Sequence, residues 1–364
     1  MAKRELLIIA LFGAAGFMAY QLLTPPSTDS GPGLSWSGWL ERARSGGRGA
    51  AVASVTREGT IPLPAGVSTL RISGISAVVI LGETRENVTY HLTVESNAPD
   101  EARARAAAEG VRLAEDVVGS ILALTVEAPA DTRLAGALTI LVPARLAAIV
   151  DGARSTDVSG VAGVTLDRVV GDARLREIAG AVTGGHRNGD LTVSGAATVA
   201  LNLLETRAVF TGIRDRLRLT VRNGETQLDG NAASVEIDGT GHTTRLAGSA
   251  GPVRIFGMGG EIHLSHPRAA VHIDVRRAPV SVALDAAIPV TVFTSERRVR
   301  VAIAPEVVVD IDARTTEPGA IDAADLGVSP EITAAGTRVR LMHAHAPAIA
   351  IRNRRGAIEI TQAK

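Results

Sequence analysis

The fold is decided by two consecutive eighteen-residue stretches, LRLTVRNGETQLDGNAAS (217–234) and VEIDGTGHTTRLAGSAGP (235–252). Each opens with apolar and polar residues in alternation, the pattern of a strand with one buried face. The same interval separates the strand centres Leu201, Leu219, Ile237, Ile255 and Ile273, and also a second series, Phe210, Leu228, Leu246, Leu264 and Val282. A fixed period of this length is typical of stacked repeats, in which each unit contacts only its neighbours. We therefore predict a mainly β protein built as a single-domain β-solenoid (β-helix) with about eighteen residues per coil.

Polar residues follow the same period. Arg218, Glu236, Arg254 and His272 occupy the same outward position in successive repeats, which would place neighbours about 4.8 Å apart in the sheet. The charges alternate along this column, so like charges do not face each other across adjacent strands. A solvated face explains the column better than a ligand-binding stripe, because exposed ion pairs contribute little and need no ligand.

The composition excludes several classes of function. The formal net charge is zero, so a nucleic-acid partner is not expected, because such a partner requires a basic surface. Cysteine is absent, which removes disulfides, thiolate metal sites and cysteine nucleophiles. Aromatic residues make up only 2% of the chain, against 38 glycines, a balance that suits thin coils joined by tight turns. Lysine occurs only at Lys3 and Lys364, and the preference for arginine and alanine indicates a GC-rich bacterial genome.

The N-terminal segment predicts a membrane anchor. Lys3 and Arg4 precede residues 6–23, an apolar run of eighteen residues interrupted only by Gln21. As a helix this run would span about 27 Å. The anchoring side chains would be Leu6, Leu7, Ile8, Ile9, Leu11, Phe12, Phe17, Leu22 and Leu23. The expected topology is a cytoplasmic tail at 1–5, a single pass through the bacterial inner membrane, and a C-terminal domain in the periplasm or outside the cell. A cleaved signal peptide and a buried core helix are the alternatives; the length of the run and the Thr-Pro-Pro that follows it favour the anchor.

Residues 24–65 are rich in Pro, Gly and Ser and predict a linker. Trp36 and Trp39 lie in it, just beyond the anchor. They could lie in the lipid headgroup region, with nearby arginines meeting lipid phosphate. Packing of the two rings against the first coil is the alternative.

Residues 66–146 are expected to form a small α/β cap over the open end of the solenoid, which would occupy 147–364. Such a cover protects exposed strand edges from aggregation. Within the cap we predict strands at 69–81, 87–94, 121–127 and 137–142, and a helix at 100–118 with Ser96 or Asn97 as its cap. Towards the C-terminus, strands are expected at 299–303, 307–311, 339–341, 349–351 and 358–360.

Two groups of histidines are candidate metal ligands. One group is His263, His266 and His272; the other is His343 and His345, which strand spacing would place on one face. No carboxylate accompanies either group at a defined spacing, so we predict no metal-binding residues. The run 257–260, Gly-Met-Gly-Gly, leads into a strand and not into a helix N-terminus, which argues against a phosphate cradle. We likewise predict no catalytic residues, no cofactor-binding residues and no cofactor.

Three features resemble a known family. They are the run 138–143 (LTILVP), the turns Val193-Ser194-Gly195 and Leu228-Asp229-Gly230, and the closing segment 353–360 (NRRGAIEI). Over about residues 69–360 they resemble the bacterial putative-adhesin family, domain of unknown function 4097. That resemblance implies a β-solenoid exposed outside the cytoplasm, with no established activity and no catalytic residues to transfer.

The sequence thus predicts a membrane-anchored, extracytoplasmic β-solenoid that is not an enzyme. It would act as a scaffold or adhesin-like binding module for a protein or polysaccharide of the cell envelope. A β-helix enzyme acting on polysaccharide, or a component of an envelope sensor, are the alternatives. An enzyme would gather ionisable groups from consecutive coils in one groove, whereas a scaffold would spread them.

Overall fold

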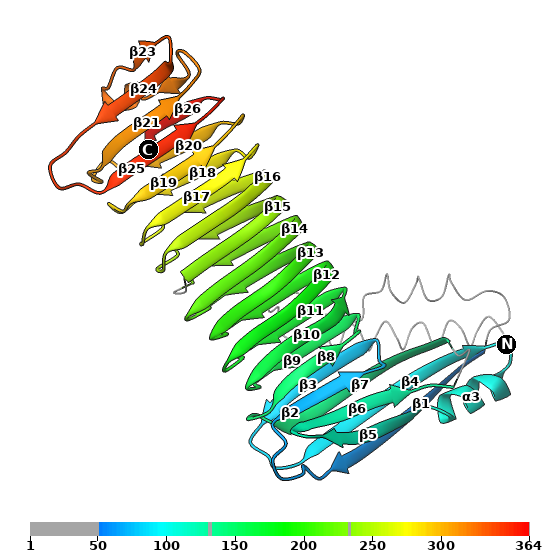
Figure 1. Cartoon of the computed structure of the whole chain (residues 1–364). Coiled ribbons are helices and arrows are strands. Elements are labelled where there is room, and N and C mark those ends of the chain that lie inside the picture. The colour runs from blue at the N-terminus through cyan, green and yellow to red at the C-terminus, as the bar shows by residue number, and fades with distance from the viewer. Residues whose placement is uncertain (1–50, 130–132, 232–233, 364) are drawn as a thin grey trace, which may run out of the picture. The chain divides into compact units, whose positions relative to one another are not determined.

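The computed structural model describes residues 51–129, 133–231 and 234–363. The predicted tail, the anchor at 6–23, and Trp36 and Trp39 lie outside these residues. Within them, no helix is both long enough and apolar enough to cross a membrane. Residues from Ala51 onward form one compact unit around a continuous sheet of 26 described strands (Figure 1). The prediction of a mainly β chain is therefore confirmed.

The centre of the unit is a ladder of parallel strands. They are β8 (Ala147–Asp151), β9 (Ser155–Ser159), β10 (Gly163–Val170), β11 (Asp172–Arg176), β12 (Ala181–Ser194), β13 (Thr198–Thr211), β14 (Arg216–Asp229), β15 (Ser234–Ala247) and β16 (Val253–Ser265). Leu219 pairs with Leu201 on one side and with Ile237 on the other, and Ile255 pairs with Ile237 and Ile273. The second series, from Phe210 to Val282, pairs in the same way. The predicted register is confirmed, and both series are buried.

From β12 to β16 each repeat is one long strand with a bend, not the two separate strands that the two apolar centres suggested. The bend falls at a residue with positive φ: Asn188 (54°), Glu205 (52°), Asn223 (50°), Gly241 (62°) and Gly259 (70°). A left-handed residue turns the chain sharply while the backbone ladder continues on both sides. The first half of each strand therefore belongs to one row of the ladder and the second half to the other. We call these positions the corner.

At the N-terminal end the two rows continue into antiparallel strands. One row runs from β9 through β3 (Ala77–Glu83) and β7 (Arg133–Pro143) to β4 (Val88–Ala98) and β1 (Ala51–Ile61). The other runs from β8 through β2 (Thr69–Ser73) and β6 (Ile121–Glu127) to β5 (Arg112–Val118). The predicted strand 69–81 is divided at Gly74 (φ 80°), where a Cβ atom would lie 2.3 Å from the carbonyl oxygen of Val126.

The helix in this region corrects the sequence prediction. Only Glu101–Glu109 is helical, as α3, and its N-cap is Asp100, whose side chain accepts a hydrogen bond from the Arg103 N–H at 2.8 Å. The predicted caps, Ser96 and Asn97, belong to β4. Residues 112–118 form β5 because antiparallel pairing with β6 satisfies their backbone groups and overrides the helical spacing of their side chains. Residues 51–61, assigned above to the linker, form β1.

At the C-terminal end the rows separate again. One contains β17 (Val271–Arg276), β19 (Val290–Thr294), β25 (Ala348–Asn353), β21 (Asp310–Thr315), β24 (Gly336–Leu341) and β23 (Glu331–Thr333). The other contains β18 (Val280–Leu284), β20 (Val299–Ile303), β26 (Ile358–Gln362) and β22 (Ile321–Asp322), followed in sequence by the short helix η1 (Ala324–Leu326). The strand predicted at 307–311 starts later, at Asp310, because the Val307 N–H bonds to the Ala304 carbonyl in a turn and Val308 is exposed.

Candidate functional site

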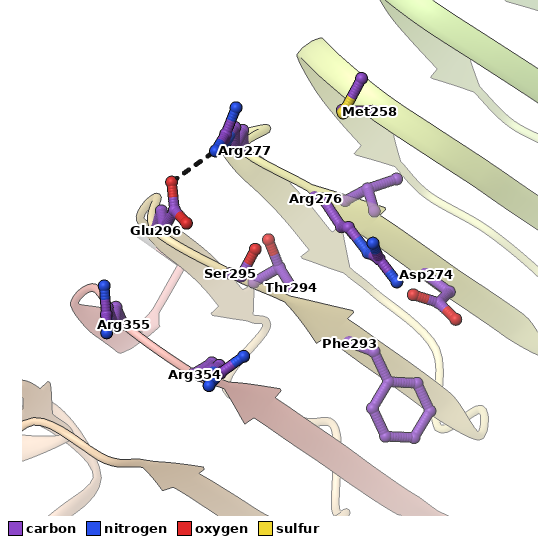
Figure 2. A pocket seen from close by; sticks show the side chains of 11 residues that line it. Met258, Asp274, Arg276, Arg277, Phe293, Thr294, Ser295, Glu296, Arg354 and Arg355 are labelled. Carbon is purple, nitrogen blue, oxygen red and sulfur yellow. Dashed lines mark hydrogen bonds and ion pairs between the residues drawn. The ribbon is translucent and has the colours of Figure 1, made fainter.

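An open pocket of about 540 Å³ lies beside the turns that follow β17, β19 and β25 (Figure 2). It is lined by Met258 and by residues 274–277, 293–296 and 354–355. Four of these residues are arginines: Arg276, Arg277, Arg354 and Arg355. We call it the arginine pocket.

The backbone holds the three turns together in register. The Arg277 N–H donates to the Ser295 carbonyl at 3.0 Å, and the Arg354 N–H donates to the Thr294 carbonyl at 3.1 Å. The Asn353 side-chain amide donates to the Arg297 carbonyl at 2.7 Å. Because ladder bonds fix each turn, the side chains at their ends project from a rigid frame.

The pocket carries an excess of positive charge. Arg277 Nε lies 3.1 Å from Glu296 Oε2, which neutralises that pair. Among the described residues, Arg276, Arg354 and Arg355 make no side-chain hydrogen bond or ion pair. Asp274 is the other carboxylate of the lining. With four arginines against two carboxylates, the pocket is suited to a ligand that carries negative charge.

Most other arginines near the pocket are already engaged. Asp312 receives hydrogen bonds from Arg314 at 3.0 Å, Arg338 at 3.1 Å and Arg352 at 2.8 Å. Burial disfavours ionisation of Asp312, but these three hydrogen bonds outweigh it and lower the pKa of that carboxyl to about 2. This cluster holds β21, β24 and β25 together, so its three arginines stabilise the structure and are not available to a ligand. The unpaired arginines of the pocket stand apart from it.

Two exposed apolar side chains also line the pocket, at opposite sides of Arg276 in Figure 2. Phe293 is 40% exposed and Met258 is 48% exposed. The imidazole of His272 lies between two phenyl rings, with ring centroids 5.7 Å from Phe256 and 5.8 Å from Phe293. The exposed phenyl face beside unpaired guanidinium groups offers a ligand both an apolar contact and a charged one.

The histidines grouped by sequence do not form one site. His263 pairs with Glu261 at 2.9 Å, His266 pairs with Asp285 at 3.2 Å, and His272 stacks between phenylalanines. No group of three metal-ligating side chains occurs in the part of the chain that the structure describes. His343 and His345 lie in the connection after β24 and not in a strand, so the spacing argument for them was wrong.

The glycines at 257–260 have a packing role. A Cβ atom at Gly257 would lie 1.9 Å from the Gly239 carbonyl oxygen, and one at Gly260 would lie 1.7 Å from that of His242. The adjacent strand therefore leaves no room for larger residues there. In the outward column, Arg218 lies 3.7 Å from Glu236 with both side chains exposed, as a solvated face requires.

The arginine pocket was not predicted from the sequence. The only local signals are the doublets 276–277 and 354–355, and nothing in the eighteen-residue period relates them. They meet because β25 enters the ladder beside β19, out of chain order.

Comparison with known proteins leaves the family open. No family model matches the chain, and no curated protein matches it. Among solved structures, a putative cell adhesion protein from Clostridium sporogenes matches at 11% identity, covering 86% of this chain and 100% of its own, with a TM-score of 0.19. A putative adhesin from Parabacteroides merdae matches at 13% identity, covering 66% and 93%, with a TM-score of 0.38. A putative adhesin from Parabacteroides distasonis matches at 10% identity, covering 85% and 97%, with a TM-score of 0.31. Scores this low do not establish a shared fold or activity, and membership of the family of domain of unknown function 4097 stays a prediction.

Proposed function

We propose that this protein is a non-enzymatic, adhesin-like binding module of the cell envelope, built as a β-solenoid of the kind found in the family of domain of unknown function 4097. The arginine pocket is its ligand site and takes an anionic group of an envelope partner. The observation that carries the proposal is the set of three guanidinium groups without partners, Arg276, Arg354 and Arg355, held at one pocket by stacked turns.

The architecture supports the structural part of the proposal. Parallel pairing of Leu201, Leu219, Ile237 and Ile255 at an interval of eighteen residues is what a solenoid requires. The antiparallel strands at both ends supply caps for the rows. A rigid stack of this kind presents loops and turns at fixed spacing, which suits it to recognition.

The chemistry supports an anionic ligand. A guanidinium group presents a planar fork of donors that matches a carboxylate, sulfate or phosphate in bidentate geometry. In this pocket those donors are not used by the fold. The exposed ring of Phe293 adds an apolar contact for the body of the ligand.

Ionisable side chains from successive turns do gather at the arginine pocket, which is the pattern expected above of an enzyme. The proposal of a non-enzymatic role rests instead on where the groups with a shifted pKa lie. The carboxyls with lowered pKa, Asp151 and Asp312, are held by arginines in contacts between strands. The histidines with lowered pKa, His186 and His242, are buried inside the ladder. None of the four lines the arginine pocket, whereas a catalytic site would gather such groups around its substrate.

A binding assay tests the ligand site. The full-length chain, purified in a neutral detergent, would be titrated calorimetrically with trigalacturonate, with a hexaglutamate peptide, and with neutral maltotriose. We expect at least one acidic probe to bind and maltotriose not to bind. The double variant Arg276→Ala, Arg354→Ala should weaken that binding, while Arg145→Ala, which removes an exposed arginine far from the pocket in sequence, should not. Absence of binding by both acidic probes, or binding unaffected by the double variant, would contradict the proposal.

We also propose that residues 6–23 anchor the chain in the bacterial inner membrane, with the remainder in the periplasm or outside the cell. The basis is the apolar run after Lys3 and Arg4. Protease added to spheroplasts should then digest the C-terminal domain and leave a membrane-bound stub. A fully protected chain would overturn the orientation, and a mature N-terminus beyond Leu23 would overturn the anchor.

A further inference from the structure

A line of outward positions next to the corner leads away from the arginine pocket. Its members pair directly with one another across the ladder: Arg187, Leu204, Arg222, Thr240, Met258 and Arg276. No carboxylate occupies any of these positions. We call this line the arginine edge.

None of the three arginines of the edge has a side-chain interaction that stabilises the described part of the chain. Among the described residues, Arg187 and Arg222 make no side-chain hydrogen bond or ion pair, as is also true of Arg276. Two further outward columns lie on the same face. In one, Arg218 is paired with Glu236; the other, next to the edge, carries Asp238 and Asp274. Neither aspartate forms an ion pair with an arginine of the edge among the described residues, so three guanidinium groups in line with the charged pocket stay available to a ligand.

A second pocket lies at the far end of the edge. It has a volume of about 500 Å³, and Arg187 and Arg222 form part of its lining. Its outward positions Gly185, Asn202 and Thr220 pair across β12, β13 and β14. The amide of Asn202 and the hydroxyl of Thr220 offer hydrogen bonds to neutral polar groups, and Gly185 leaves space because it has no side chain. This combination suits hydroxyl-bearing sugar units next to an acidic one.

The two pockets are separated by one strand only. Arg222 of the second pocket lies on β14 and Met258 of the arginine pocket lies on β16, with Thr240 of β15 between them. From Arg187 to Arg276 there are five strand steps, which correspond to about 24 Å. An extended polymer could follow the whole line from Arg187 to Arg276, whereas a trisaccharide is too short to reach from one end to the other.

We infer that the arginine edge and its two pockets form one continuous binding track for a linear acidic polysaccharide, charged by carboxylate or sulfate groups. This inference rests on the proposed binding function and extends its ligand from a single anionic group to a polymer. A nucleic acid fits less well. The chain as a whole is neutral, whereas binding of a phosphate backbone requires a broadly basic surface.

The test compares ligands of different length on variants at the far pocket. Full-length chain in neutral detergent would be titrated with trigalacturonate, polygalacturonate, dextran sulfate, uncharged dextran and a twenty-residue oligothymidylate. The double variant Arg187→Ala, Arg222→Ala should bind one of the acidic polymers roughly tenfold more weakly, since each exposed charged contact is worth up to about fivefold. Its affinity for trigalacturonate, which cannot reach Arg187 from the arginine pocket, should fall less than its affinity for the polymer. The polymer that responds identifies the charged group.

Matched variants exclude a general effect of charge. Arg145→Ala, Arg216→Ala removes the same number of exposed, unpaired arginines away from the edge and should leave polymer binding unchanged. Thr240→Arg, which fills the gap between the pockets, should strengthen it. Circular dichroism spectra and Tm values would establish that all variants are folded.

The outcomes separate the two proposals. One outcome is that trigalacturonate binds through Arg276 and Arg354 while the Arg187→Ala, Arg222→Ala variant binds polymer as well as the control Arg145→Ala, Arg216→Ala does. In that case the continuous track is wrong and the proposed ligand site in the arginine pocket is unaffected. Tighter binding of oligothymidylate than of either acidic polysaccharide would overturn the ligand class. If no acidic probe binds, the proposed function fails, and the track fails with it.

Discussion

The imidazole ring of His242 occupies the space beside Gly239 that any larger side chain at that position would need. A Cβ atom built on Gly239 would lie 2.1 Å from Cε1 of His242. The residue paired with Gly239 on β14 is Val221, which is fully buried. In β15 a ring from the second half of the strand therefore fills the interior that a valine fills in β14. Both ring nitrogens are buried and have no hydrogen-bond partner among the described residues.

Acid should therefore destabilise the ladder through His242. Burial lowers its pKa, because the charged ring is poorly solvated inside the sheet. The unfolded chain then takes up the proton more readily than the folded chain, so stability is fully present above the ordinary pKa near 6.5 and falls as the pH drops below it. His242→Phe should reduce the fall in Tm between pH 7.5 and 5. The control is His345→Phe, which replaces an exposed histidine outside the ladder and should leave that fall unchanged. His186, also buried with a lowered pKa, should preserve part of the effect. An undiminished fall in His242→Phe would refute the assignment.

The carboxylate of Asp312 should stabilise the C-terminal strands through its three arginines. Its folded pKa of about 2 lies below the ordinary value of 3.8. The stabilisation is therefore present above pH 4 or so and disappears as the pH falls towards about 2. Asp312→Asn should cost at most about 2 kcal/mol near neutral pH, measured by urea unfolding, and the difference from the wild type should shrink below pH 4. Asp238→Asn, an exposed carboxylate, is the control. A difference that does not change with pH would show that the ionised group is not responsible.

Substitutions at an inward and at an outward position of one strand should change the stability of the protein by very different amounts. Ile237 is completely buried in β15, and its neighbour Glu236 is exposed. Ile237→Asp places an unpaired charge between stacked strands and should cost more than about 4 kcal/mol, a large fraction of the stability of a typical folded protein. Glu236→Ala should change the free energy of unfolding by less than about 1 kcal/mol. Equal Tm values for the two variants would disprove the inward and outward assignment.

The corner residue Glu205 should be more stable as glycine. Its φ of 52° is left-handed, a conformation that costs a residue with a Cβ atom about 1–2 kcal/mol. Glu205→Gly should therefore raise the free energy of unfolding by up to about 1 kcal/mol, after the loss of chain entropy is subtracted. The same exchange in an extended strand, Glu236→Gly, should lower it by a similar amount. If both variants are destabilised, the corner is not the strained position that its backbone angle indicates.

The register of the ladder could be predicted because its cause is local and repeated. Leu219, Ile237 and Ile255 lie at identical positions in successive repeats, and a one-residue slip would expose all of them. The helix was predicted too long because Val117 and Val118 match a helical stripe, although both are exposed in β5. The hydrogen bonds that decide the outcome there come from β6, outside the local segment. The sequence held part of the explanation for the buried ring of His242. Gly239 occupies the position that Val221 holds in the preceding repeat, which leaves room for a large side chain from elsewhere in the strand.

The site could not be predicted, for a different reason. Arg276 ends β17 and Arg354 follows β25, far apart in the chain, and they reach one pocket only because β25 inserts between β19 and β21. The unpaired state of Arg187 and Arg222 is equally hidden in the sequence. Whether an arginine is neutralised depends on distances to carboxylates on neighbouring strands, and the period alone does not determine these distances.

Because one strand separates the two pockets, the number of repeats between them sets the length of ligand that can contact both. Each added or deleted repeat would change the distance between the pockets by one strand spacing, about 4.8 Å, without altering the residues of either pocket. Because adjacent repeats such as 217–234 and 235–252 have the same length, unequal recombination between their coding segments would preserve the inward register. A lineage could thus adjust the span of ligand that it measures in discrete increments, by gene rearrangement alone and with no point mutation in the recognition groups.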